Sequence, residues 1–349
     1  MLKNKMSVIS IINSLELNAG PKAKSDITKI VIDNYNGNEL VLDIKTNPYK
    51  SGKFPYLILN LLRKIVFLKK VKKINAIKIF QYPVMRNFKI LKNNINYKDC
   101  ILFVHDIKSL KDQINNEEEF RFINKFEYIV CHNDIMKEEF IKHGVSPEKI
   151  HVLEIFDYLC DVSNNSDENK FDINNIRIAY TGNLVRTKAP FIYQINENKM
   201  NFELYLYGIG YDDSYVNSKI HYKGSFNPNE LPSNIKEDIG LIWDGDANSA
   251  VDENTGFKNY DKFISPHKLS CYIAAGIPVI TWKKFGIANF VEKENIGYLI
   301  DNIDDINNIN FKDYNEKKQN ILKLSEKVKN GYYTKRVIDE ILEEMEKRK

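Results

Sequence analysis

Five residues able to bind an anion are gathered just before a segment of small and apolar residues, 269–275, which the sequence predicts to be helical: Tyr260, Lys262, Ser265, His267 and Lys268. Ser265 is a typical helix N-cap residue, and Pro266 suits the first helical position. Free N–H groups at a helix start, with nearby cations, attract phosphate. The cluster therefore predicts a phosphate site. An ordinary capped helix is the alternative interpretation, and both can hold at once.

A second candidate phosphate site follows the predicted strand 175–180. The sequence there continues Gly182-Asn183-Leu184, with Arg186 and Lys188 close behind. A glycine after a strand lets backbone N–H groups approach a ligand, and two cations suit a diphosphate. An ordinary turn between strand and helix is the alternative. Gly20, after the first predicted strand, is a similar candidate: it would bring a loop close to a sugar and its phosphates, or would simply form a turn.

His105 and Asp106 follow the predicted strand 100–104. A carboxylate beside an imidazole can act as general base on a sugar hydroxyl, although a histidine at a strand end is often structural. If the pair is inert, Glu16 beside the Gly20 loop is the next candidate.

Asp244-Gly245-Asp246 resembles the Asp-x-Asp pattern that holds Mn or Mg against a diphosphate in metal-dependent glycosyltransferases. The pattern is short, and acidic residues are abundant in this chain. The order of the other motifs, with the nucleotide half in the second domain, favours a site without metal.

These residues need a framework of parallel strands. Apolar, β-branched runs alternate with helical patterns along the whole chain, which predicts a parallel α/β sheet. In the first half the predicted strands are 6–12, 39–44, 76–80, 100–104, 128–132 and 151–155, with helices at 56–73, 117–124 and 135–143. In the second half they are 175–180, 202–207, 220–222, 239–243, 278–282 and 297–300, with one helix before Gly276 and a charged helical pattern over 319–349.

The length of 349 residues allows two domains. The polar stretch 161–172 predicts a linker between a domain at 1–160 and a domain at 173–329, with 330–349 packing back on the first. The expected fold class is α/β, with two Rossmann-like domains. Ligands of such sheets bind at the carboxyl ends of strands, so the site is expected in the cleft between the domains.

The charge is unevenly distributed. The chain carries a net charge of +4, yet residues 44–98 contain 14 Lys and Arg and no Asp or Glu. Its densest part, residues 60–80, interleaves apolar and basic residues at helical spacing. A solvated surface helix is one interpretation, and contact with an anionic membrane or lipid diphosphate is the other. Nucleic acid is disfavoured because no recognised binding module accompanies the charge.

Other features predict a cytosolic protein. No run of 18 apolar residues is present, and the apolar start lacks the small-residue cleavage site of a signal peptide. The four cysteines are too scattered for a zinc motif and are expected to be reduced core residues.

With these segments in hand, the chain resembles bacterial glycosyltransferases of the GT-B fold. It is most similar to the group containing galactofuranosyltransferases of O-antigen and capsule synthesis and the glucosyltransferases that extend glycans on serine-rich adhesins. The matching stretches include FVHDIKSL, YIVCHNDIMKEEF, IAYTGNL, GLIWDGD and YDKFISPHKLSCYIAAGIPVI, in this order between residues 101 and 300. The first hundred residues match only loosely, as expected if they carry acceptor specificity.

The resemblance implies a UDP-sugar donor bound mainly by the second domain, a glycan acceptor on lipid or protein, no metal or other cofactor, and a homo-oligomer. Arg186 and Lys262 resemble the family's diphosphate contacts, and Tyr260 falls in the same donor loop. Ser265 stands where an asparagine is expected in relatives, and His105-Asp106 matches the family's His-Asp pair.

One departure bears on stereochemistry. Many retaining GT-B enzymes carry two glutamates at positions that here are Phe263 and Cys271. Neither side chain can stabilise positive charge as a carboxylate does, which favours inversion. The sequence thus predicts an inverting, metal-independent hexosyltransferase. The alternatives are a metal-dependent transferase using Asp244 and Asp246, and a non-catalytic sugar-nucleotide-binding subunit of another transferase.

Overall fold

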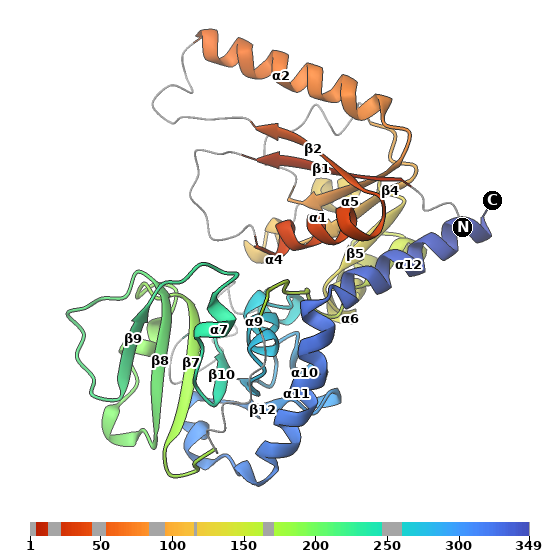
Figure 1. Ribbon diagram of the computed structural model, residues 1–349. Coiled ribbons are helices and arrows are strands. Elements are labelled where there is room, and N and C mark those ends of the chain that lie inside the picture. Colours follow the sequence, from red (N-terminus) through yellow and green to blue (C-terminus); the bar gives the residue numbers. More distant parts are fainter. Residues whose placement is uncertain are drawn as a thin grey trace. The chain divides into compact units, whose positions relative to one another are not determined.

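The computed structural model describes residues 5–12, 22–43, 54–83, 95–114, 117–162, 171–245 and 260–348. The chain divides into two compact units, of which the first comprises 1–153 with 334–349 and the second 154–333 (Figure 1). Most of the predicted linker 161–172 lies outside the described residues. Each unit contains one parallel sheet, as predicted.

The sheet of the first unit has the order β2-β1-β3-β4-β5-β6, and all of its neighbouring strands are parallel. The inner strands β4 and β5 are buried along their whole length, so they read as continuous apolar runs, whereas the edge strand β2 exposes Val41. All five residues of β4 are buried, for example. The strands are β1 (Met6–Ile12), β2 (Asn38–Asp43), β3 (Ile77–Tyr82), β4 (Cys100–Val104), β5 (Tyr128–Cys131) and β6 (Ile150–Val152).

Helices of the first unit connect these strands. The sequence interpretation missed α1, which buries Ile27, Ile30 and Val31 at helical spacing. The last helix of the chain, α12, belongs mostly to this unit, and Tyr35 donates a hydrogen bond to Asp339 on it. The helices are α1 (Lys22–Asn34), α2 (Phe54–Lys73), α4 (Lys108–Lys111), α5 (Glu117–Ile123), α6 (Asp134–Lys142) and α12 (Tyr332–Lys347).

The sheet of the second unit has the order β12-β11-β10-β7-β8-β9, again with parallel neighbours. Strand order reverses direction at β7 and β10, so these two central strands are adjacent although other strands separate them in sequence. Their carboxyl ends form the point of a parallel sheet where ligands commonly bind. The strands are β7 (Ile176–Asn183), β8 (Phe202–Ile209), β9 (Ile220–Gly224), β10 (Ile239–Ile242), β11 (Val279–Trp282) and β12 (Gly297–Ile300).

The helices of this unit are α7 (Leu231–Asn234), α9 (His267–Ala275), α10 (Ala288–Lys293) and α11 (Tyr314–Lys329). Helix α9 ends at Gly276 in the left-handed conformation with φ 71°, as the Ala-Ala-Gly pattern predicts. Its Tyr272 packs over Gly240 of β10, where a Cβ atom would lie 2.4 Å from the ring. The Tyr272 hydroxyl accepts from the Thr181 amide at 2.9 Å, which ties α9 to β7.

The helical pattern predicted over 319–349 is two helices rather than one. Helix α11 ends at Lys329 and α12 begins at Tyr332. Gly331 between them has φ 72°, a left-handed conformation that a helix cannot continue through.

Candidate functional site

The ammonium group of Lys268 lies at the carboxyl ends of the two central strands of the second unit. Its Nζ is 3.0 Å from the Tyr180 hydroxyl of β7 and 3.0 Å from Oδ1 of Asp244, which follows β10. Burial disfavours the charged form, but the Asp244 carboxylate and Tyr180 oxygen outweigh it, so the pKa of Lys268 is raised. This lysine therefore keeps a positive charge at the strand ends.

Gly182 makes room for this lysine. Its φ is 148°, and a Cβ atom there would lie 3.2 Å from Cε of Lys268. The next strand has Gly208 in register with Gly182. The structure thus brings together Gly182 and Lys268, which lie in two motifs that the sequence predicts to bind phosphate.

Arg186 lies in the loop after β7, where Asp212 and Tyr193 engage its guanidinium. Nε donates to Asp212 at 2.8 Å, and the guanidinium carbon lies 4.3 Å from the centre of the Tyr193 ring. A hydrogen bond from Ser214, together with the one from Arg186, lowers the pKa of Asp212 to about 2. Half of the Arg186 side chain is exposed, so its diphosphate role stays a prediction.

Ser265 does not cap α9, contrary to the sequence interpretation. Pro266 occupies the cap position in an extended conformation, and the helix begins at His267. Ser265 is buried, and its hydroxyl donates to the carbonyl of Glu154 at 2.7 Å. The extended backbone at 264–266 directs this side chain toward segment 154–158 instead of toward the first turn.

His267 also faces this segment. Its Nε2 lies 3.2 Å from the Asp157 carbonyl, and its ring stacks on Tyr158 with centroids 4.7 Å apart. These contacts are structural, and any donor contact of Ser265 or His267 stays a prediction.

Three further donor candidates are Tyr260, Lys262 and Asn183. Tyr260 is buried. Lys262 lies on the turn Asp261–Phe263 with its ammonium 4.8 Å from the Phe263 ring centre. Asn183 is exposed, and its Oδ1 accepts from the Val185 amide at 3.1 Å.

His105 and Asp106 follow β4 in the first unit. The His105 amide donates to the Tyr82 carbonyl at 2.9 Å, and its ring Nε2 lies 2.9 Å from Oε1 of Gln81. Asp106 Oδ2 lies 3.0 Å from the Lys111 ammonium. The pair thus sits at the carboxyl end of its sheet, where the sequence places it.

Buried residues surround this pair. Glu119 of α5 accepts from the amides of Lys108 and Ser109, which begin α4, and from the Tyr82 hydroxyl. His132, which follows β5, is buried with Nε2 2.9 Å from the Val104 carbonyl, and burial lowers its pKa to about 4. The sequence interpretation missed Gln81, Glu119 and His132. A glutamine directly after the apolar pair Ile79-Phe80 was the available signal for Gln81.

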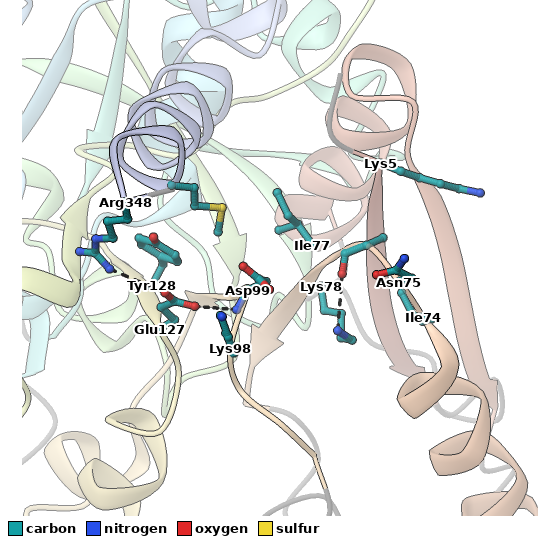
Figure 2. Close-up of a pocket in the computed structure, with 12 residues that line it drawn as sticks. Lys5, Ile74, Asn75, Ile77, Lys78, Lys98, Asp99, Glu127, Tyr128 and Arg348 are labelled. Atoms are coloured by element: carbon teal, nitrogen blue, oxygen red, sulfur yellow. Dashed lines mark hydrogen bonds and ion pairs between the residues drawn. The ribbon is translucent and has the colours of Figure 1, made fainter. Parts of the chain in front are cut away.

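A cavity of about 390 Å³ lies at the opposite, amino-terminal edge of the first sheet (Figure 2). Lys78, Asp99 and Tyr128, at or beside strand starts, line it together with Arg348. Glu127 accepts from the Asp99 amide at 2.6 Å and lies 3.7 Å from Arg348. The cavity is therefore separate from the edge that carries His105 and Asp106.

Helix α2 presents an apolar stripe to solvent. Ile58, Leu61, Leu62, Ile65 and Val66 are 39–53% exposed, while Phe67, Leu68 and Val71 are buried. No helix within the described part of the chain is long and apolar enough to cross a membrane.

One predicted position, Gly20, falls outside the described residues, as do two residues of the alternative interpretations, Asp246 and Glu16. Among the residues that the structure does describe, no three His, Cys, Asp or Glu side chains form a group suited to a metal.

The fold is shared with solved GT-B glycosyltransferases. HepE from Anabaena, solved in complex with UDP-glucose, has a TM-score of 0.57 at 13% identity and covers 98% of this chain and 99% of its own. The lipopolysaccharide outer core galactosyltransferase WaaB has a TM-score of 0.60 at 15% identity, covering 97% and 99%. Two parallel α/β units with polar clusters at their strand ends thus define the GT-B fold.

The sequence places the chain more narrowly. The N-terminal domain of the glucosyltransferase 3-like family matches residues 5–155, and its C-terminal domain matches 178–341. The chain belongs to this glucosyltransferase 3-like family, which confirms the resemblance drawn from the motifs.

Individual relatives agree. The β-1,6-galactofuranosyltransferase WbbI of Escherichia coli is 29% identical over 286 residues, or 77% of this chain and 80% of WbbI. Glucosyltransferase 3 of Streptococcus gordonii is 24% identical over 264 residues, or 73% and 74% of the two chains.

Proposed function

We propose that this enzyme transfers a hexose from a UDP-sugar to a hydroxyl of a surface-glycan or glycoprotein acceptor, with inversion and without a metal. The relatives' names include galactofuranosyl and glucosyl transfer. HepE binds UDP-glucose with the same fold. Both observations favour a UDP-hexose donor.

The charged Lys268 beside Gly182 carries the donor assignment. A phosphate oxygen needs donors and positive charge in a place where backbone can approach closely. Lys268 supplies the charge, and the glycine leaves space above β7. Arg186 and Lys262 would add cations to the diphosphate, and the amides at the start of α9 would add N–H donors.

The reaction needs one base and one leaving-group site. The oxygen of an acceptor hydroxyl bonds the anomeric carbon as the bond from that carbon to the phosphate oxygen breaks. The hydroxyl proton passes to His105 or Asp106, and UDP leaves with its added charge stabilised by the cations of the second unit.

The residues at the positions of the retaining glutamates support the proposal of inversion. Phe263 and Cys271 are both buried, and neither can act as a carboxylate toward the donor sugar. Direct attack from the face opposite UDP needs no such group.

The test is a donor screen followed by product analysis. UDP-glucose, UDP-galactose and UDP-galactofuranose should raise the melting temperature, and GDP- and TDP-sugars should not. The NMR coupling at the anomeric position of the product should report inversion. His105→Ala or Asp106→Asn should cut transfer by roughly 10²–10⁴-fold and leave UDP binding intact. Retained configuration, or full activity of both variants, would contradict the proposal.

Two alternative functions predict different experimental results. A metal-dependent transferase would use Asp244 and Asp246 and lose activity in EDTA. A non-catalytic partner subunit would bind the donor but show no turnover until the catalytic chain is added.

The proposal includes an anionic lipid surface as partner, through residues 60–80. In α2 the exposed apolar stripe is accompanied by six cations and no acid: Arg63, Lys64, Lys69, Lys70, Lys72 and Lys73. Pairing of this helix with a second copy of itself would oppose cation with cation, whereas anionic headgroups complement it. A cytoplasmic location and a homo-oligomer are further parts of the proposal.

A further inference from the structure

Gln81 is a buried amide inside β3, and its NH₂ group has two acceptors. Nε2 donates to the Lys24 carbonyl at 3.0 Å and to the Thr28 hydroxyl oxygen at 3.1 Å. Thr28 in turn donates its own proton to the same carbonyl at 2.9 Å. Both hydrogens of the Gln81 amide are therefore committed to helix α1.

This arrangement fixes which end of the amide meets His105. A backbone carbonyl can only accept, so the NH₂ end of Gln81 must face Lys24. The carbonyl end then faces His105, with Oε1 2.9 Å from Nε2 of the ring. Because an amide oxygen can only accept, Nε2 must carry a proton.

We propose that Gln81 is a positioning residue that holds His105 as the Nε2–H tautomer, which puts the basic lone pair on Nδ1. This inference rests on the proposed function, in which His105 is a candidate base. Nδ1 takes the proton of the acceptor hydroxyl while the hydroxyl oxygen bonds the anomeric carbon and the sugar–phosphate bond breaks. The ring then holds protons on both nitrogens, with Nε2–H still bound to Gln81.

Charged groups around the ring come from several elements and stay constant in the test. Asp106 is the next residue along the chain, and Lys111 pairs with it. The charge of Asp106 also interacts with Lys24 of α1 and with His132 after β5. Glu119 of α5 binds the Tyr82 hydroxyl next to Gln81.

The first experiment observes the tautomer of His105 directly and does not require a measurement of enzyme activity. Long-range ¹H–¹⁵N spectra of the full chain labelled at its six histidines should show a protonated Nε2 and an unprotonated Nδ1 for His105. The His105 signal is assigned by its loss in His105→Asn. A protonated Nδ1 in the neutral ring would overturn the proposal.

The second experiment uses pH–rate profiles. Gln81→Glu places a carboxylate beside Nε2–H and favours the imidazolium, so the active neutral form appears only at higher pH. The acidic limb of kcat should move up by about 1–2 pH units. Gln319→Glu, an exposed change of the same charge on α11, should leave the limb in place. A purely structural role of Gln81 would lower the rate without moving the limb, and that result would overturn the inference.

Gln81→Leu provides a second variant. It should lower kcat about tenfold with the donor KM unchanged, since one orienting hydrogen bond is lost. If His105→Asn keeps full activity, the base assignment itself fails, whatever the tautomer. If His105→Asn is inactive while both Gln81 variants keep the wild-type profile, only the positioning role fails.

Discussion

Lys268 and Asp244 form an ion pair at the carboxyl ends of β7 and β10, with Nζ 3.0 Å from Oδ1 and both side chains mostly buried. The carboxylate that would begin an Asp-x-Asp metal pattern thus has a cation as its partner. An incoming diphosphate would meet this lysine in a charged, preorganised state.

Activity in EDTA tests the metal question. Cationic side chains and helix N–H groups can offset the charge of the leaving UDP, so transfer should be unchanged after chelation. Initial rates with and without EDTA provide the measurement; Asp244→Asn removes the ion-pair partner of Lys268, so any loss of rate should be the same in both conditions. Loss of activity in EDTA with recovery in Mn or Mg would make Asp244 and Asp246 the leading site.

Gly182→Ala tests the space around Lys268. The added methyl group would press against Cε of Lys268, and the alanine backbone would have to keep an unfavourable φ. UDP affinity should therefore fall about tenfold. Gly224→Ala is the matched control, since Gly224 has φ 91° but nothing within 4 Å of its Cβ position. The measurement is calorimetric titration with UDP. If both variants bound UDP equally weakly, backbone strain alone would account for the loss of affinity. If Gly182→Ala bound UDP as tightly as the unmodified chain, the prediction would be wrong.

Arg186→Ala and Lys262→Ala test the remaining cations. Loss of a charge-assisted contact should weaken UDP binding by about 1.5–3 kcal/mol in each. Lys223→Ala removes an exposed cation beside Tyr205 and should bind UDP normally. Unchanged affinity in both test variants would remove these residues from the donor site.

The buried His132 should make stability depend on pH. Burial lowers its pKa from 6.5 to about 4, so the unfolded chain binds the extra proton first as pH falls. The free energy of unfolding should therefore decrease by about 3 kcal/mol as the pH falls from 6.5 to 4. Urea unfolding of His132→Gln across this range should show a weaker slope. An identical slope would mean that other groups cause the acid sensitivity.

Vesicle binding tests the surface of α2. The full chain should bind anionic vesicles at low salt and release them at high salt, because each Lys or Arg contributes about 1 kcal/mol near such a surface. Leu61→Ser/Leu62→Ser should weaken binding that Ile173→Ser/Val216→Ser leaves intact, since the latter are exposed apolar residues outside α2. No binding at low salt would favour the alternative interpretation, in which α2 is an ordinary solvated surface helix.

Much of the fold could be predicted from sequence because local patterns determine it. Buried parallel strands such as β4 and the helix end at Gly276 depend on apolar runs and on one glycine, which are visible in the chain. The Ser265 cap was wrong because its hydroxyl bonds the Glu154 carbonyl, 111 residues away in sequence. Gln81 and Asp244 gain their partners from segments that are distant in sequence, and spacing along the chain contains no information about such contacts.

Helix α12 constrains the order in which the two units can fold during synthesis. Its buried residues Val337, Ile338 and Ile341 belong to the first unit, together with residues 1–153. A ribosome therefore exposes the whole second unit before it supplies the last piece of the first. The second unit can fold as it emerges, whereas the first lacks the buried side chains of α12 until residues 334–349 are made. A fragment ending before Thr334 should accordingly be recovered as an aggregate, and adding α12 as a separate peptide should rescue it.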